Sequence, residues 1–143
     1  MGDLRQIIEQ HYQNVATANY AAEEEIFSPD AVNVDPGAGR LEGIAAFKAY
    51  EEGFRRAFPD GRLIMKSAVE SGNTIATEGL FVGTHTGPMW TPNGEIPPTY
   101  RKLELPFGDF FQFENGRIVS HHIYYDQIAF MMQLGLLPEP ASR

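Results

Sequence analysis

The sequence predicts an α+β domain in which N-terminal helices pack on the concave face of a curved antiparallel sheet. Hydrophobic residues recur at helical spacing in the first part of the chain, and from residue 62 onward they follow the two-residue period of strands. The pair Asn115-Gly116, typical of tight hairpin turns, separates the last two strands. Helices that precede an antiparallel sheet pack together on one of its faces. A curved sheet covered in this way leaves a cone-shaped hollow, where small-molecule sites commonly form.

The elements follow in order along the chain. Residues 4–18 and 44–58 predict helices, because apolar side chains return every three or four positions. The second helix has a wide aromatic stripe that includes Phe54 and ends before Pro59-Asp60-Gly61. A proline-rich loop is expected over residues 88–98, and one or two helical turns over residues 126–134. Strands are expected over residues 31–35, 62–70, 74–86, 100–113 and 117–125.

Composition bounds the function. The chain has 143 residues, the size of one domain, which we expect to span residues 1–143. Its 11 basic and 19 acidic residues give a formal net charge of −8, which argues against nucleic acid as a partner. The absence of cysteine excludes disulfides and thiol nucleophiles. We expect no signal peptide, no membrane span and a cytoplasmic location. The 10 Phe, 6 Tyr and 1 Trp suffice to line a hydrophobic cavity.

The last predicted strand carries the densest group of polar side chains. With a two-residue period, His122, Tyr124 and Asp126 share one face, and the residues between them share the other. If the first set faces the hollow, a carboxylate, a phenol and an imidazole converge on an aromatic cavity, as general acid/base catalysis requires. The structural alternative is that Asp126 caps the following helix and that His122 is a hydrogen-bonded core residue.

Gln112, on the preceding strand, has two possible orientations. A two-residue turn at Asn115-Gly116 places Asp109 opposite His122, whereas a three-residue turn with a bulge places Gln112 on the Asp126 face. The sequence leaves both registers open.

Other candidates for substrate binding come from several parts of the chain. They are aromatic or polar residues that pattern or turn position brings toward the hollow: Tyr12, Tyr124, His85, Trp90, Phe54 and Asp35. Ordinary packing or turn formation is the alternative for each of them. No metal site is expected, since His121 and His122 point to opposite sides of a strand. Leu80 and Val82 would be exposed on the sheet face away from the helices, which predicts a homodimer that packs through the sheet.

Several motifs give the chain a family resemblance. They are concentrated near the C-terminus and comprise Gly83-Thr84-His85-Thr86-Gly87-Pro88, Ile96-Pro97-Pro98-Thr99, Asn115-Gly116-Arg117-Ile118, Tyr124-Tyr125-Asp126-Gln127 and Gln133-Leu134-Gly135-Leu136 with Pro138. With them the chain resembles the SnoaL-like polyketide cyclase group of the nuclear transport factor 2-like (NTF2-like) family. The resemblance extends over nearly the whole chain.

The resemblance implies a cone-shaped α+β barrel, commonly homodimeric, that works without metal or organic cofactor. In the cyclases of the group, a carboxylate at the end of the last strand is the general acid/base, and Asp126 matches it. Its histidine partner corresponds to Gln112, which cannot exchange a proton. Tyr12 matches a tyrosine that lines the pocket of the group.

Three functions are therefore compared. The leading hypothesis is a cofactor-independent acid/base enzyme that acts on a hydrophobic, carbonyl-containing small molecule. Asp126 would form an enolate, held by Gln112, Tyr124 or His122, and the product would be a closed ring or a shifted double bond. The second hypothesis is a non-catalytic ligand-binding module, which the glutamine at position 112 favours. The third is an epoxide hydrolase that uses Asp109, Asp126 and Arg101.

Overall fold

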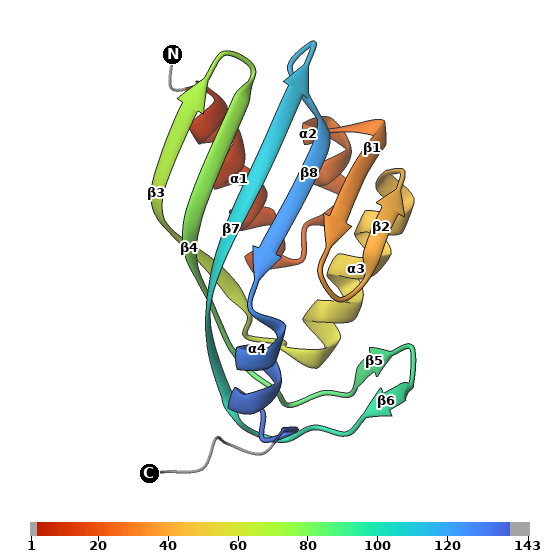
Figure 1. The fold of residues 1–143 in the computed structure, drawn as a ribbon. Coiled ribbons are helices and arrows are strands. Elements are labelled where there is room, and N and C mark those ends of the chain that lie inside the picture. The colour runs from red at the N-terminus through yellow and green to blue at the C-terminus, as the bar shows by residue number, and fades with distance from the viewer. Residues whose placement is uncertain (1–2, 138–143) are drawn as a thin grey trace.

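The computed structural model describes residues 3–137 (Figure 1). The chain begins with helices and short strands and continues with a long antiparallel array. The helices are α1 (Asp3–Thr17), the 3₁₀ turn η1 (Tyr20–Ala22), α2 (Glu23–Ile26), α3 (Ile44–Ala57) and α4 (Gln127–Gln133). The strands are β1 (Phe27–Asp35), β2 (Gly39–Glu42), β3 (Arg62–Ser71), β4 (Thr74–Thr84), β5 (Met89–Thr91), β6 (Gly94–Ile96), β7 (Lys102–Glu114) and β8 (Arg117–Tyr125).

Six strands form one curved, open sheet in the order β2-β1-β8-β7-β4-β3. Neighbouring strands are antiparallel except for β1 and β8, which run parallel. The expected antiparallel sheet therefore has one parallel pair. It arises because β1 and β8 are far apart in sequence and meet in the middle of the sheet, so no tight turn constrains their direction.

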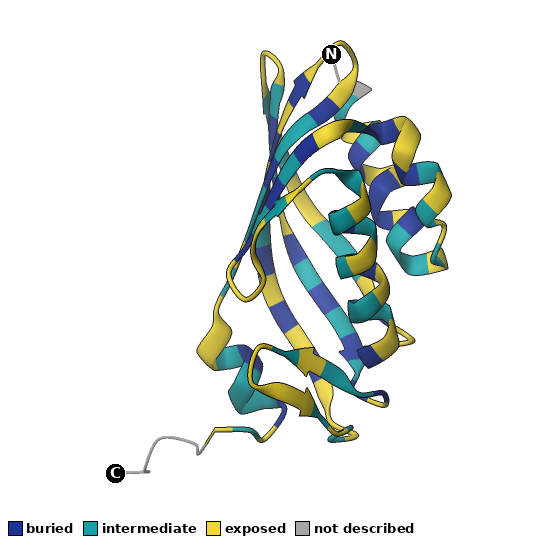
Figure 2. Ribbon diagram, turned by 90° about the vertical axis from the view of Figure 1, so that its right-hand side faces the viewer, coloured by how far each residue is buried: buried dark blue, intermediate teal, exposed yellow. Residues whose placement is uncertain are grey.

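Helices α1 and α3 both lie on one face of the sheet, as Figure 2 shows from the side. Their apolar stripes face the strands: Ile8 and Tyr12 of α1 are buried, and so is Phe47 of α3. The core between helices and sheet is rich in phenylalanine, with Phe27, Phe58 and others fully enclosed. The predicted α+β class, with helices on the concave face, is confirmed.

The hairpin between β7 and β8 determines which side chains face the helices. Its turn has two residues, because Glu114 pairs with Arg117. The register then shifts by one: Phe113 pairs with Ile118, but Gln112 pairs with Ser120. Val119 is therefore an extra residue on β8, a β-bulge, and every side chain beyond it changes face.

Two other segments differ from the expectation. The Pro-Gly turn after β1 leads into an additional short edge strand, β2. The proline-rich loop contains a two-stranded ribbon, β5–β6, which is separate from the main sheet. Within residues 3–137, no helix combines the length and apolar character needed to cross a membrane.

Candidate active site

A cavity of about 100 Å³ lies between the two long helices and the concave face of the sheet. Its wall is mainly aromatic, with Phe47, Tyr50, Phe54, Phe58, Phe81, Phe107 and Tyr125 among the lining residues. The polar groups that reach it include His11, Glu51, Arg55, Asp109 and His121. A cavity of roughly 150 Å³ can hold benzene, so this space suits part of a hydrophobic molecule.

The central polar contact of the cavity joins Asp109 of β7 to His121 of β8. The Nε2 atom of His121 lies 3.0 Å from Oδ1 of Asp109. Both side chains are almost completely buried, with 5% and 2% of their residue surface exposed. The ring of His121 also stacks on Phe111, with ring centroids 4.1 Å apart. Stacking on Phe111 therefore fixes the plane of the imidazole ring, and the contact with Asp109 fixes the direction of its Nε2 atom.

Tyr12 of α1 holds the other oxygen of the same carboxylate. Its hydroxyl donates to Oδ2 of Asp109 at 2.6 Å and also lies 2.6 Å from Oγ1 of Thr77 on β4. Since Tyr12 has one proton and gives it to Asp109, Thr77 donates to Tyr12. Burial, and then the charge of Asp109, raise the pKa of Tyr12 far above its ordinary value. Tyr12 therefore keeps its proton and donates it in a hydrogen bond to the carboxylate.

The protonation of His121 follows from its surroundings. Burial lowers its pKa, although Asp109 acts in the opposite direction, so the neutral ring is favoured. The carboxylate can only accept, so Nε2 carries the proton. The other ring nitrogen, Nδ1, lies 2.8 Å from the side-chain oxygen Oδ1 of Asn33, and two acceptors cannot form a hydrogen bond with each other. Asn33 is completely buried, and its Nδ2 group has no partner among the described residues. A rotated amide would supply the donor that Nδ1 then needs.

A second group of polar residues lies next to the first. Asp35, at the end of β1, accepts hydrogen bonds from the hydroxyls of Tyr50 at 2.6 Å and Tyr125 at 3.2 Å. The backbone N–H groups of Gly37 and Ala38 also donate to Asp35. Burial, and then the Asp35 charge, raise the pKa of both tyrosines. Each phenol therefore gives its proton to Asp35, and its oxygen can only accept from a molecule in the cavity.

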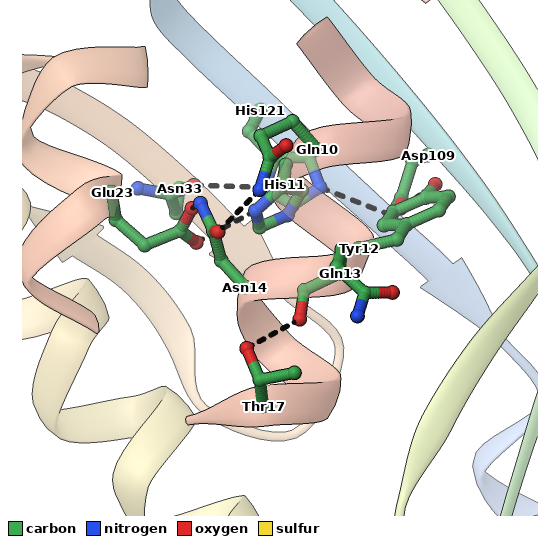
Figure 3. A network of polar contacts seen from close by, with 10 residues as sticks. All are labelled: Gln10, His11, Tyr12, Gln13, Asn14, Thr17, Glu23, Asn33, Asp109 and His121. Atoms are coloured by element: carbon green, nitrogen blue, oxygen red, sulfur yellow. Dashed lines mark hydrogen bonds and ion pairs between the residues drawn. The ribbon is translucent and has the colours of Figure 1, made fainter. Parts of the chain in front are cut away.

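A third group extends from α1 to α2 (Figure 3). Nδ1 of His11 lies 2.7 Å from Oε2 of Glu23, whose other oxygen accepts from Asn14 at 2.9 Å. Glu23 is fully buried. Burial alone would raise the pKa of Glu23, but His11 and these hydrogen bonds hold it below the ordinary value. Glu51 of α3 completes this group.

The structure does not bring together the group predicted on the last strand. Tyr124 is 59% exposed, His122 lies on the same outward face, and Gln112 is exposed on the neighbouring strand. The expectation that this face lines the hollow is wrong, because the bulge at Val119 turns it outward. Asp126 is also exposed and caps α4, since its Oδ1 accepts from the N–H of Ala129 at 3.0 Å.

The other predicted residues divide between the cavity and the surface. Tyr12 lies beside it, and Phe54 forms part of its wall. Asp35 contacts the cavity through its two tyrosines. His85 is buried elsewhere, against Phe58 and Thr99, and Trp90 is 69% exposed on β5.

Sequence reasoning missed Asp109 and His121 as a pair. Each residue stands out in the sequence. Asp109 interrupts a run of phenylalanines in β7, and His121 is next to His122, which was predicted to be catalytic. The signal that would have found them is their common face with Phe107, Phe111 and Ile123. That face could be assigned only with the position of the bulge.

Comparison with known proteins agrees with this architecture. The family model described as SnoaL-like polyketide cyclase matches residues 6–134. No curated protein matches the chain significantly.

Solved structures share the fold at low sequence identity. A candidate SnoaL-like polyketide cyclase from Jannaschia sp. CCS1 has a TM-score of 0.82 at 16% identity, with 93% of this chain and 92% of that chain covered. IdmH, a candidate polyketide cyclase from Streptomyces antibioticus, has a TM-score of 0.79 at 23% identity, covering 93% and 99%. AclR, a candidate hydroxylase from Streptomyces galilaeus, has a TM-score of 0.82 at 21% identity, covering 96% and 99%. At these identities the structures establish the fold, and the family match covers most of the chain. The chain belongs to the SnoaL-like polyketide cyclase family.

Proposed function

We propose that the protein catalyses proton transfer on a hydrophobic, carbonyl-containing small molecule, in an intramolecular aldol ring closure or a related isomerisation. The observation that carries this proposal is the Asp109–His121 pair at the wall of an aromatic cavity. Family membership and the candidate cyclases among the structural neighbours support it. The proposal moves the general base from Asp126 to Asp109, because Asp126 lies outside the cavity lining.

Asp109 is equipped to accept a proton from the substrate. A carboxylate has about four lone-pair positions, and Tyr12 and His121 occupy one on each oxygen. A substrate carbon next to a carbonyl would transfer its proton to a remaining position and become an enolate. The enolate carbon would attack a second carbonyl of the same molecule, and Asp109 would return the proton to the new alkoxide. The proton count is balanced over this cycle.

The two donors to Asp109 would stabilise the intermediate. While the carboxylate is charged, the Tyr12 hydroxyl and the His121 N–H are held by it. Once Asp109 has taken a proton, its attraction for them falls, and the same hydrogens can donate to the enolate oxygen. This role replaces the predicted one of Gln112, Tyr124 and His122, which lie on the outward face.

Ligand binding without chemistry is the second candidate. It is favoured by the closed hydrogen-bond network around Asp109, in which both carboxylate oxygens already have partners. The three residues of the epoxide hydrolase hypothesis do not lie together in the cavity. Asp109 lines the cavity, whereas Asp126 and Arg101 are exposed.

As to partners, we propose a second copy of this chain, bound through the outward face of the sheet. Val69, Ala76 and Phe110 follow one another across β3, β4 and β7, and Val69 and Phe110 are 70% and 45% exposed. An exposed apolar sheet face is typical of a self-complementary interface. The predicted pair Leu80 and Val82 extends the same face of β4.

The direct test is a substrate screen with product analysis by mass spectrometry. Aromatic polyketide-like and steroid-like carbonyl compounds would be incubated with the wild-type protein and with the Asp109→Asn variant. Isomeric or cyclised product from the wild type alone would support the enzyme proposal. Equal binding by both proteins with no product from either would favour the binding module.

A further inference from the structure

Three buried side chains beside the cavity have the composition of a metal centre. His11, Glu23 and Glu51 come from three different helices, α1, α2 and α3. Each offers one ligand atom, and these atoms all lie within 4.8 Å of one another. Exposed fractions of the three residues are 2%, 0% and 5%, so water competes little for this space. Exposed acidic clusters are common on proteins, but a buried cluster with this composition requires compensation of its charge.

Glu51 provides the second observation. Both of its carboxylate oxygens are inaccessible to solvent, and neither meets the geometric criteria for a hydrogen bond to the described residues, although the Glu23 carboxyl is close enough to share a proton with Glu51. The hydroxyl of Tyr20, whose surroundings include Glu51, is also buried without a partner. Buried polar groups nearly always have partners in native proteins. Two buried carboxylates this close together require a positive species between them, either a shared proton or a metal ion.

We propose that His11, Glu23 and Glu51 bind a divalent transition-metal ion, with Zn²⁺ as the reference ion. One imidazole nitrogen and two carboxylate oxygens form a donor set that suits zinc, iron or manganese better than magnesium or calcium. A doubly positive ion balances the two carboxylates. Three protein ligands also leave at least one coordination position open, as in catalytic rather than structural zinc sites.

The open position would face the cavity. His11 and Glu51 both line it, whereas Glu23 lies behind them. The rings of His11 and His121 are in edge-on contact, with centroids 6.0 Å apart, so the site adjoins the Asp109–His121 pair. An ion here would polarise a carbonyl oxygen of a bound molecule. The inference concerns ion binding and stands independently of the proposed proton transfer.

A proton is the alternative occupant. Burial, and then the neighbouring Glu23, raise the pKa of Glu51, so the metal-free protein holds Glu51 as the neutral acid. A metal ion must displace this proton, and the test has to distinguish the two occupants.

The experiment uses the full chain, treated with a chelator and titrated with ZnCl₂ and MnCl₂ in a calorimeter. We expect one site per chain. The Glu51→Gln variant keeps the shape of the side chain but removes a ligand charge. Residues that only support metal ligands are worth about 10–100-fold in affinity, so losing a ligand should weaken binding roughly 100-fold or more. The matched control is Glu52→Gln, the exposed neighbour on the same helix, which should bind as the wild type does.

Thermal unfolding and diffraction complete the test. Zn²⁺ should raise the Tm of the wild type and of Glu52→Gln, but not that of Glu51→Gln. Anomalous scattering at the zinc edge should locate the ion between the three side chains. This measurement uses wild-type crystals, so it tests the proposal even if Glu51→Gln fails to fold. The proposal is overturned if the wild type binds no zinc, if Glu51→Gln binds it equally well, or if the ion lies elsewhere, for instance at His122.

Discussion

Asp109 and His121 meet diagonally across the β7–β8 pair, with Nε2 3.0 Å from Oδ1, although the backbone register places Ile123 opposite Asp109. Diagonal neighbours of this kind are within reach of long side chains. The contact connects two strands in the middle of the sheet, and Tyr12 ties the same carboxylate to α1. The pair is therefore held from both layers of the domain.

The first prediction concerns the general base. Asp109→Asn preserves size but removes the group that accepts the proton, and turnover of an identified substrate should fall about 10²–10⁴-fold. Steady-state kinetics with mass-spectrometric product detection would measure it. Asp126→Asn is the matched control, because asparagine also caps helices well and should leave turnover nearly unchanged. If Asp126→Asn lost most of its turnover while Asp109→Asn kept normal turnover, the general base would be Asp126, at the end of β8, and not Asp109.

Tyr12→Phe should show whether the Tyr12 hydroxyl contributes to the chemical step at Asp109 or to substrate binding. The variant deletes one hydroxyl that bridges Asp109 and Thr77, and the ring stays in place. A hydrogen bond to a charged group contributes about 1.5–3 kcal/mol. We expect kcat to fall roughly 10-fold or more while KM changes little. Tyr100→Phe, at a residue that is 71% exposed, is the control. An equal loss in both variants would argue against a positioning role.

His85 should make stability depend on pH. Burial lowers its pKa, opposed by the backbone of Gly87, so the folded protein binds a proton less readily than the unfolded chain. The unfolded state therefore holds more protons below about pH 6.5, and stability should decrease as the pH falls through this range.

Protonation of His85 would also disrupt the bond in which Nδ1 accepts from the Thr99 N–H at 3.1 Å. Urea unfolding at pH 8, 7, 6 and 5 would test this, with His85→Gln expected to lose less stability on acidification than the wild type. At pH 8 the ring is neutral in both states, so the difference there reports only the packing and hydrogen bonds that the variant loses. Parallel curves for the two proteins would contradict the prediction.

Gly79 should tolerate no side chain. A Cβ atom at this position of β4 would lie 1.9 Å from the carbonyl oxygen of Ile64 on β3, which is backbone and cannot rotate away. Overpacking of this kind costs about 1–3 kcal/mol or more. Gly108→Ala is the matched control, since its nearest neighbour would be an ordinary 3.6 Å away. Denaturant unfolding should show a large loss for Gly79→Ala and a small change for Gly108→Ala.

The proposed dimer can be tested by charge on the outward face. Phe110→Glu introduces a carboxylate at the β7 end of the exposed apolar row formed by Val69, Ala76 and Phe110. Light scattering after size exclusion should give twice the chain mass of 16.0 kDa for the wild type and the single mass for the variant. Gln13→Glu, on the exposed side of α1, controls for added charge. A wild type that is monomeric at high concentration would contradict the proposal.

The order of the helices and long strands followed from hydrophobic period alone, since α1, α3, β3, β4, β7 and β8 fall near the expected residues. Short elements did not. The β2 and β5–β6 segments have three or four residues each, too few to establish a period, and their pairing depends on neighbouring strands. The β1–β8 contact is non-local, so no local signal specifies its parallel direction.

The site was harder to predict than the fold for a similar reason. Tyr12 and Phe54 were found because a helical stripe identifies its buried face over many residues. The face of β8 depends on one bulge, and Val119 is an ordinary strand residue with no glycine to mark it. Glu23 and Glu51 were unpredictable as buried groups, since glutamate is almost always exposed.

The bulge determines which of two sets of β8 side chains faces the cavity. If the ladder continued without the bulge, so that Val119 paired with Gln112, the strand beyond it would present His122 and Tyr124 to the cavity in place of His121 and Tyr125. Either alignment keeps one imidazole and one phenol on the inner face, because both residue types occur in adjacent pairs. A change that straightens the bulge but keeps Val119 would exchange the inner and outer surfaces of the strand while conserving its chemical types, whereas deletion of Val119 would leave the pairing beyond it unchanged. The wall of the cavity can in this way change through the register of one strand, with no substitution at the residues that line it.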